Sequence, residues 1–147
     1  MKSQYRILMM ILATALTVFS SCKKDDDVTV APKQVDGTFT AFEFESSQGV
    51  LPLPAQGKSV EIEVTSVDKK NANVTLTLID NDDTQTVGPI ACTIEKDSDG
   101  FTVLNDKETK DLCLFYYDKN TVSYGLPEGQ GTIAASRNGK KPNWWDD

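Results

Sequence analysis

The residues with the most distinctive chemistry in this chain are its three cysteines, Cys22, Cys92 and Cys113. A thiol can act as a nucleophile, carry a lipid, bind a metal or form a disulfide. The chain has no histidine, which excludes Cys–His and Ser–His–Asp catalysis and removes a common ligand of zinc and copper. Motifs such as G-x-G-x-x-G and G-x-S-x-G are missing too. With no pair of carboxylates marked out for catalysis, we expect a protein that is not an enzyme and that holds no metal or cofactor.

Cys22 follows an N-terminal segment with the composition of a secretory signal. Basic residues open the segment, residues 7–19 are apolar apart from two threonines, and two serines precede the cysteine. The apolar run is shorter than the ~20 residues that a comfortable membrane span needs. The pattern resembles the lipobox of bacterial lipoproteins, with Phe19 in place of the more usual leucine. The resemblance implies that residues 1–21 are a signal peptide and that Cys22 becomes the first mature residue and carries lipid such as palmitate.

A charged run, Lys-Lys-Asp-Asp-Asp at residues 23–27, comes directly behind Cys22. Such a run is typical of a solvated spacer, so we expect residues 22–35 to form a flexible, lipidated tether. The run also resembles the export tag that directs lipoproteins to the outer leaflet in some Gram-negative anaerobes. The two resemblances together imply a protein that is anchored to the outer membrane and exposed at the cell surface, with the periplasmic leaflet as the alternative.

The chain is acidic, with 15 basic and 22 acidic residues and a formal net charge of −7. Removal of residues 1–21 would make it more acidic still, because that segment holds basic residues and no acidic ones. Binding to nucleic acid needs a surface rich in Lys and Arg, so this charge argues against a nucleic-acid partner. We expect a monomeric protein whose contact with the membrane is made by its lipid.

From Asp36 onward, apolar residues recur at every second position. In residues 59–67, Val60, Ile62 and Val64 alternate with polar side chains, as in a strand with one wet face. Turn residues separate the segments, and no segment after the signal has the helical spacing of apolar residues. The sequence therefore predicts about eight strands, at residues 37–45, 59–67, 74–79, 90–95, 101–104, 112–117, 121–125 and 132–137.

Short connections between these strands favour an antiparallel up-and-down meander, and closure would remove its two bare edges. We therefore predict an all-β domain at residues 36–139, folded as a closed or nearly closed barrel and followed by a C-terminal tail at residues 140–147. A Greek-key β-sandwich is the alternative. Because Phe39 and Phe44 fall on opposite parities of the first strand, a β-bulge is expected between them.

An eight-stranded barrel encloses either a packed core or one small ligand. The inner face of the predicted strands is apolar, so a cavity there would take an apolar guest such as a lipid or a flat aromatic molecule. Cys92 and Cys113 would lie two strands apart, and they either pair across the interior or stay as two buried thiols. The expected ligand-binding residues are Val60, Ile62, Val64, Leu76, Leu78, Ile90, Ile94, Phe101 and Val103.

The residues that would begin and end the barrel also follow a known pattern. Asp36-Gly37-Thr38-Phe39 opens the first strand, and Arg137 ends the last one. Lipocalins begin with Gly-x-Trp and bring a basic residue from near the last strand across that ring. The chain resembles the small lipocalin-like (calycin-like) domains of bacterial lipoproteins, with Phe39 in place of the tryptophan. The resemblance implies that Phe39 and Arg137 close the base of the barrel and do not bind a ligand.

Two other stretches offer surface for binding. The apolar segment 49–55 either forms a lid over the mouth of the barrel or packs across one open end. Tyr116, Tyr117, Tyr124, Trp144 and Trp145 form an aromatic cluster, and such rings stack on sugar faces when they are exposed. The two tail tryptophans either tuck against the barrel end as a plug or form part of a contact surface. We therefore predict a non-catalytic binding module for a small apolar ligand. The alternative is a surface interaction protein that contacts glycan or a protein through its aromatic residues.

Overall fold

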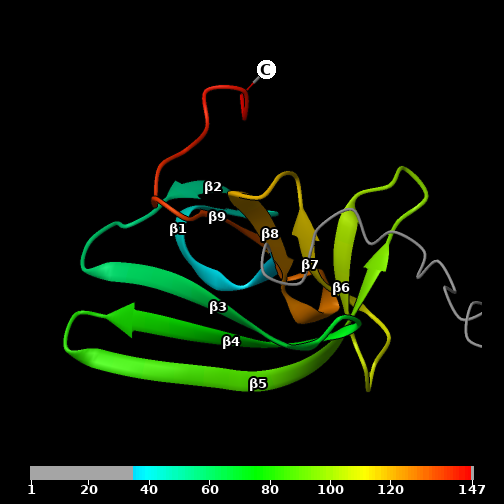
Figure 1. Cartoon of the computed structure of the whole chain (residues 1–147). Helices are drawn as coiled ribbons and strands as arrows, with labels where there is room; N and C mark the ends of the chain where they lie inside the picture. Colours follow the sequence, from blue (N-terminus) through cyan, green and yellow to red (C-terminus); the bar gives the residue numbers. More distant parts are fainter. Residues whose placement is uncertain (1–34, 147) are drawn as a thin grey trace, which may run out of the picture.

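The computed structural model describes residues 35–146, which form a closed antiparallel β-barrel (Figure 1). The predicted signal peptide, Cys22 and most of the tether lie outside the described residues. The elements of the described part are β1 (Gly37–Ser46), β2 (Gly49–Pro52), β3 (Lys58–Asp68), β4 (Asn71–Asp80), β5 (Asp83–Lys96), β6 (Thr102–Asp106), β7 (Leu112–Tyr116), β8 (Thr121–Gly125), the 3-10 helix η1 (Pro127–Gly129) and β9 (Thr132–Ser136).

The predicted fold is confirmed, and the Greek-key alternative is wrong. Strands β3 to β9 pair in chain order, and β1 pairs with β3 on one side and with β9 on the other. These eight strands close the barrel, so no barrel strand leaves its whole length unpaired. β2 was predicted as part of an apolar loop, but it forms a short extra strand against the second half of β1.

β1 pairs with three other strands because it bends at a bulge. Its first half pairs with β3, and its second half pairs with β9, with a shift of register between Ala41 and Glu43. The bulge expected from the sequence is therefore confirmed. An extra residue reverses the facing of the strand, so Phe39 lies in the core and Phe44 packs against the core despite their opposite parities.

β5 is the longest strand, and its first half lies outside the pattern predicted from the sequence. Only residues from Cys92 onward pair with β6, so the preceding residues form an edge that pairs with β4 alone. An edge tolerates proline because no second neighbour needs its N–H, which explains Pro89 within the strand. Gly88 sits at a bulge with a φ of 110°, where a Cβ would come within 2.7 Å of the Val74 carbonyl oxygen. Glycine is therefore required at this position. Because glycine and proline are typical of turns, the sequence analysis did not assign residues 83–89 to a strand.

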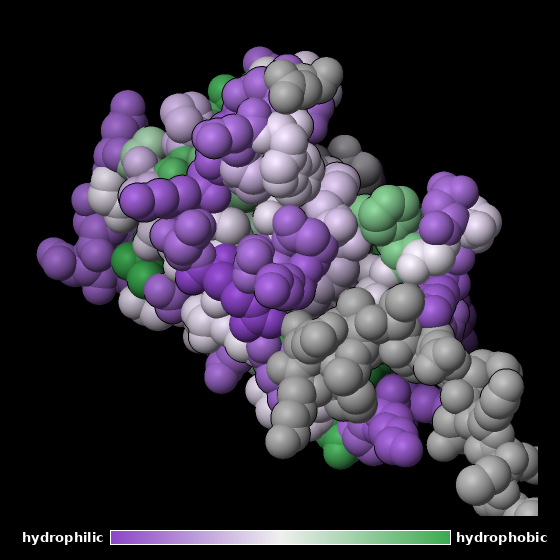
Figure 2. All heavy atoms as spheres, turned by 45° about the horizontal axis from the view of Figure 1, so that its top comes forward, coloured by the Kyte–Doolittle hydropathy of each residue, from purple (hydrophilic) through white to green (hydrophobic). Residues whose placement is uncertain are grey.

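The interior of the barrel is filled by apolar side chains from every barrel strand. Ile62, Val64, Leu76 and Ile94, all predicted to point inward, are 5% exposed or less. Figure 2 shows the complementary pattern on the face in view, where hydrophilic residues predominate and hydrophobic residues form small separate patches. Other buried members of the core are Phe39, Val74, Leu104, Leu114, Tyr116, Val122, Ile133 and Ala135.

The predicted inward facing of Phe101 and Val103 is wrong. Residues directly opposite each other in an antiparallel pair share a face of the sheet. Leu104 is opposite Ile94, so Leu104 points inward, whereas Val103 is opposite Glu95 on the outer face. Phe101 precedes β6 and is 42% exposed. Phe101 packs on the outer ring of Phe115 instead.

Leu78 is also not enclosed, for a different reason. It lies opposite Val60 on the inner face, as predicted. However, β3, β4 and β5 extend together past the rest of the barrel, as the long ribbons of Figure 1 show, and Leu78 near the β4–β5 turn remains 39% exposed. The facing of this residue was correct, but the strand continues beyond the elements that could cover it.

Candidate functional site

One end of the barrel, here called the base, is closed by an aromatic and cationic cluster. The Arg137 guanidinium lies over the ring of Phe39, 4.5 Å from its centroid. The ring of Tyr116 meets Phe39 edge to face at 5.9 Å, and its hydroxyl donates a buried hydrogen bond of 3.0 Å to the Val35 carbonyl. Burial raises the pKa of Tyr116, so the hydroxyl stays protonated. The two residues predicted to close the base, Phe39 and Arg137, are thus in contact there.

Gly37 leaves room for the guanidinium of Arg137 because it has no side chain. Its φ is 142°, and a Cβ built on it would overlap Arg137 Nη1. Arg137 also donates from Nε to the Lys119 carbonyl at 2.7 Å, which ties the end of β9 to the β7–β8 turn. These contacts join the start of β1, the end of β9 and the β7–β8 turn, so we interpret the cluster as structural.

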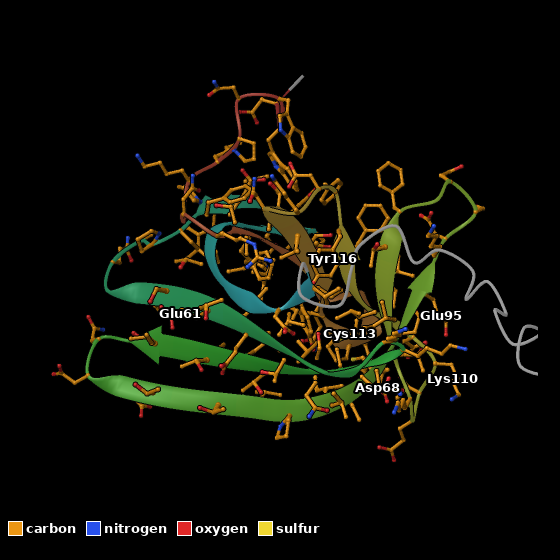
Figure 3. All side chains as sticks on the ribbon, viewed as in Figure 1. Glu61, Asp68, Glu95, Lys110, Cys113 and Tyr116 are labelled. Carbon is orange, nitrogen blue, oxygen red and sulfur yellow. The ribbon has the colours of Figure 1, made fainter. Side chains whose placement is uncertain are left out.

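Cys92 and Cys113 come together inside the barrel as two free, buried thiols. Sequence parity could not place Cys113. A register shift between β6 and β7 turns both Cys113 and its neighbour Leu114 inward, and Figure 3 labels Cys113 and Tyr116 among the interior side chains. A hydrogen bond between the thiols lowers the pKa of Cys92 and raises the pKa of Cys113. The pair is held as small apolar core residues, the second of the two predicted alternatives.

The opposite end of the barrel, here called the mouth, carries an apolar hollow of about 280 Å³. We call it the mouth hollow. It lies between β1, β2 and the segment after it, the start of β3, the end of β4, the segment before η1, and β9. Its only charged lining residues among those described are Lys58 and Asp80, which form a half-exposed ion pair of 3.0 Å at the rim. The apolar lining includes Phe44, Leu51, Leu53, Val60, Leu78 and Leu126.

A second hollow, of about 310 Å³, lies beside the mouth hollow and shares Leu126 with it. Its lining is more polar and includes the carboxylates of Asp106, Asp111 and Glu128. Burial raises the pKa of Tyr124, which also lines it, to about 12, so that hydroxyl is a hydrogen-bond donor at neutral pH. These three acidic groups make this hollow more polar than the mouth hollow and disfavour an anionic guest.

Seven of the nine predicted ligand-binding residues lie in the core or in the two hollows, whereas Phe101 and Val103 lie on the outer side of the barrel. Ile62, Val64, Leu76 and Ile94 are packed in the core. Val60 and Leu78 line the mouth hollow, and Ile90 lines the hollow beside it. Leu51 and Leu53 come from the apolar segment 49–55, which was predicted to lie over an open end of the barrel. Sequence reasoning missed Phe44, Leu126 and Ile133, because they come from chain segments whose meeting depends on the closed barrel.

The C-terminal tail is docked on the outside of the barrel by Glu43. This carboxylate is only 8% exposed, and it accepts hydrogen bonds from Trp145 Nε1 (3.0 Å) and Lys141 Nζ (2.7 Å). Trp145 also meets the ring of Phe42 edge to face at 5.2 Å. Trp144 remains 45% exposed. One tail tryptophan therefore tucks against the barrel, while the other presents its ring to solvent.

Among the described residues there is no cluster of three or more His, Cys, Asp or Glu side chains that could hold a metal ion. No helix in the same part of the chain has the length and hydropathy of a membrane span. When the chain was compared with protein families, curated proteins and solved structures, none matched it. What this protein does must therefore be inferred from its own geometry.

Proposed function

We propose that this protein is a non-catalytic binding module that holds a small apolar molecule in the mouth hollow. The single observation that carries the proposal is the apolar lining of that hollow, to which Leu53, Leu78 and Leu126 contribute from three separate segments. Its volume of about 280 Å³ is near the lower end of ligand pockets, which span ~300–1,000 Å³. A guest of this size is a short-chain or single-ring molecule.

The ion pair at the rim suits a ligand with one polar end. Lys58 and Asp80 are about half exposed, so their mutual attraction is weak and either can turn to a ligand. An apolar body inside the hollow with a polar group at the rim would satisfy both regions. The N-terminal sequence adds the setting: the chain is a lipoprotein anchored through Cys22 at the outer membrane, and its barrel presents the hollow to the surroundings.

The proposal is tested on the mature chain, residues 22–147, with Cys22→Ser so that no lipid is added. We expect saturable binding of the fluorescent apolar probe anilinonaphthalene sulfonate at one site, displaced by short-chain fatty acids or alcohols. Leu78→Lys places a charge in the hollow and should lower the affinity for the probe by at least about tenfold.

Val67→Lys is the matched control, because Val67 is an exposed apolar residue of the neighbouring strand, 63% exposed and not part of the hollow. It should leave binding unchanged. Equal affinities for the two lysine variants would contradict the assignment to the mouth hollow. Native mass spectrometry of the chain purified from its host would then show whether a ligand is retained at all.

A further inference from the structure

A row of aromatic rings crosses the outside of β6 and β7 and ends at the tail tryptophans. Phe101 packs on Phe115 with ring centroids 5.3 Å apart, and Phe115 packs on Tyr117 at 4.8 Å. Tyr117 contacts both tryptophans of the tail. Phe101, Tyr117 and Trp144 are 42%, 40% and 45% exposed. A continuous set of half-exposed rings is uncommon on a protein surface without a binding role.

At the tail end of this row the surface is hollowed. This tail hollow has a volume of about 360 Å³ and lies between the β7–β8 turn, the end of β9 and the C-terminal tail. It is at the base of the barrel, far along the strands from the mouth hollow. Its walls are mainly polar, and Trp144 supplies the aromatic one. The lining includes Asp118, Asn120, Asn138, Lys140, Asn143 and Trp144.

The polar groups of the tail hollow have unused hydrogen-bonding capacity. Within residues 35–146, the side-chain amides of Asn120 and Asn143 make no hydrogen bond, and Asn138 uses only its Oδ1. Asp118 accepts two backbone hydrogen bonds at Oδ1, from Asn120 and Thr121, which leaves its Oδ2. The hollow therefore offers several donors and acceptors side by side, positioned by a turn that is already hydrogen-bonded.

The aromatic wall is held in place by the docked tail. Trp144 contacts Trp145 at 5.7 Å and Tyr117 at 6.0 Å, and Trp145 is anchored by its hydrogen bond to Glu43. Lys141 bridges Glu43 and Asp146 at 2.7 Å and 2.6 Å. Because the fold already orders this segment, a ligand would not have to order it on binding.

We propose that the tail hollow binds a neutral saccharide. The face of an indole ring is electron-rich and attracts the weakly positive C–H groups on the flat face of a sugar ring. A sugar hydroxyl both donates and accepts hydrogen bonds, which matches amide side chains such as those of Asn120 and Asn143. Lys141 is neutralised by its two acidic partners, and Lys140 and Asp118 have opposite charges. A balanced lining of this kind favours an uncharged ligand over an anion.

The test is a titration of the mature chain (residues 22–147, Cys22→Ser) with the neutral oligosaccharides that bind it on a glycan array. Binding should change the tryptophan emission, because Trp144 is one wall of the site. Trp144→Ala and Asn120→Ala should each weaken binding by about tenfold or more. Circular dichroism confirms that each variant keeps its strand content.

Phe101→Ala is the matched control, since Phe101 is an exposed ring at the far end of the same row and does not line the tail hollow. It should bind sugar as the parent chain does. Loss of binding in Phe101→Ala to the same extent as in Trp144→Ala would mark the whole row as a flat contact surface and overturn the assignment to the hollow. An array on which no saccharide binds would overturn it too. Neither result bears on the mouth hollow, so the two proposals fail independently.

Discussion

At the scale of single residues, the buried polar groups of this barrel differ in whether their hydrogen bonds are satisfied. Tyr116 and Glu43 are buried, and each has its hydrogen bonds satisfied. Thr102 is 3% exposed, and its Oγ1 has no partner within the described residues. A buried hydroxyl without a partner loses its hydrogen bonds to water and gains nothing in return. This residue is therefore a local weakness of the fold.

Thr102→Val should stabilise the protein by about 1–2 kcal/mol, because it replaces the unpaired hydroxyl with a methyl group of similar size. Urea denaturation followed by circular dichroism measures the change. Ser136→Ala is the contrasting variant, since Ser136 is equally buried but its Oγ lies 2.9 Å from Asn138 Oδ1 and 2.8 Å from the Lys140 carbonyl oxygen. That variant should be destabilised. A lower midpoint for Thr102→Val would show that the hydroxyl has a partner in solution.

Single residues also limited the sequence analysis. The sequence analysis placed Phe101 and Val103 on the inner face of their strand. The structure places the ring of Phe101 outside, in contact with Phe115, and gives the interior position to Leu104. Short strands carry few residues per face, so one exposed aromatic side chain is enough to reverse the assignment. Only the pairing with β5 resolves it.

At the scale of elements, alternation of apolar and polar residues predicted the eight strands that close the barrel, and the opposite parities of Phe39 and Phe44 predicted the bulge in β1. The prediction failed at the bulge and edge of β5. The first half of β5 contains Gly88 and Pro89, which are turn residues by composition but occupy a bulge and an edge here. The mouth hollow could not be predicted, because its walls meet only where strands of unequal length end.

The C-terminal tail is the element whose position is most easily tested. Glu43→Ala removes the acceptor for Trp145 Nε1 and the buried partner of Lys141. The lost hydrogen bond at the indole should cost about 2 kcal/mol of stability, and the released Trp145 should shift the fluorescence to longer wavelength. Glu45→Ala on the same strand is the control, because Glu45 is exposed. Unchanged emission in Glu43→Ala would show that the tail is held by other contacts.

The docking of the C-terminal tail through Lys141 should depend on pH, and the direction of the change follows from the pKa of this residue. The side chains of Asp146 and Glu43 raise the pKa of Lys141 above its ordinary value of 10.5. A group whose pKa is higher in the folded state stabilises that state fully below its unfolded pKa and loses this contribution as the pH rises through the folded value. The ion pairs of the tail should therefore persist through neutral pH and be lost only above about pH 10.5. Near-ultraviolet circular dichroism should show this transition in the parent chain and not in Lys141→Gln.

At the scale of the whole molecule, closure depends on a seam between the first and last strands. β1 and β9 pair along this seam, and the base cluster lies at one end of it. Arg137 joins the ring of Phe39 to the β7–β8 turn, while Tyr116 ties the chain entering β1 to the interior. The sequence predicted Phe39 and Arg137 through a resemblance, but it placed Tyr116 among exposed rings, which is wrong because Tyr116 is buried. The contact of Arg137 with Phe39 also required Gly37, whose role is visible only from the position of the guanidinium.

Gly37→Ala should therefore weaken closure more than an ordinary glycine substitution does. The added methyl group would overlap Arg137 Nη1, and the φ of 142° is unfavourable for a side chain. Gly100→Ala is the matched control: its φ is also positive, at 86°, but a Cβ there meets no atom within 4 Å. We expect Gly100→Ala to cost about 1 kcal/mol from backbone strain and Gly37→Ala to cost about 2–3 kcal/mol, both measured by urea denaturation.

A double-mutant cycle separates the strain at Gly37 from the overlap with Arg137. In the background of Arg137→Ala, the guanidinium that the new methyl group would strike is absent, so Gly37→Ala should cost no more than Gly100→Ala does. The difference between the two backgrounds is the coupling between the start of β1 and the end of β9. If Gly37→Ala costs the same in both backgrounds, the overlap is relieved without loss. That result would contradict a coupling between Gly37 and Arg137, while the cost of Arg137→Ala alone still measures the contact of the guanidinium with Phe39.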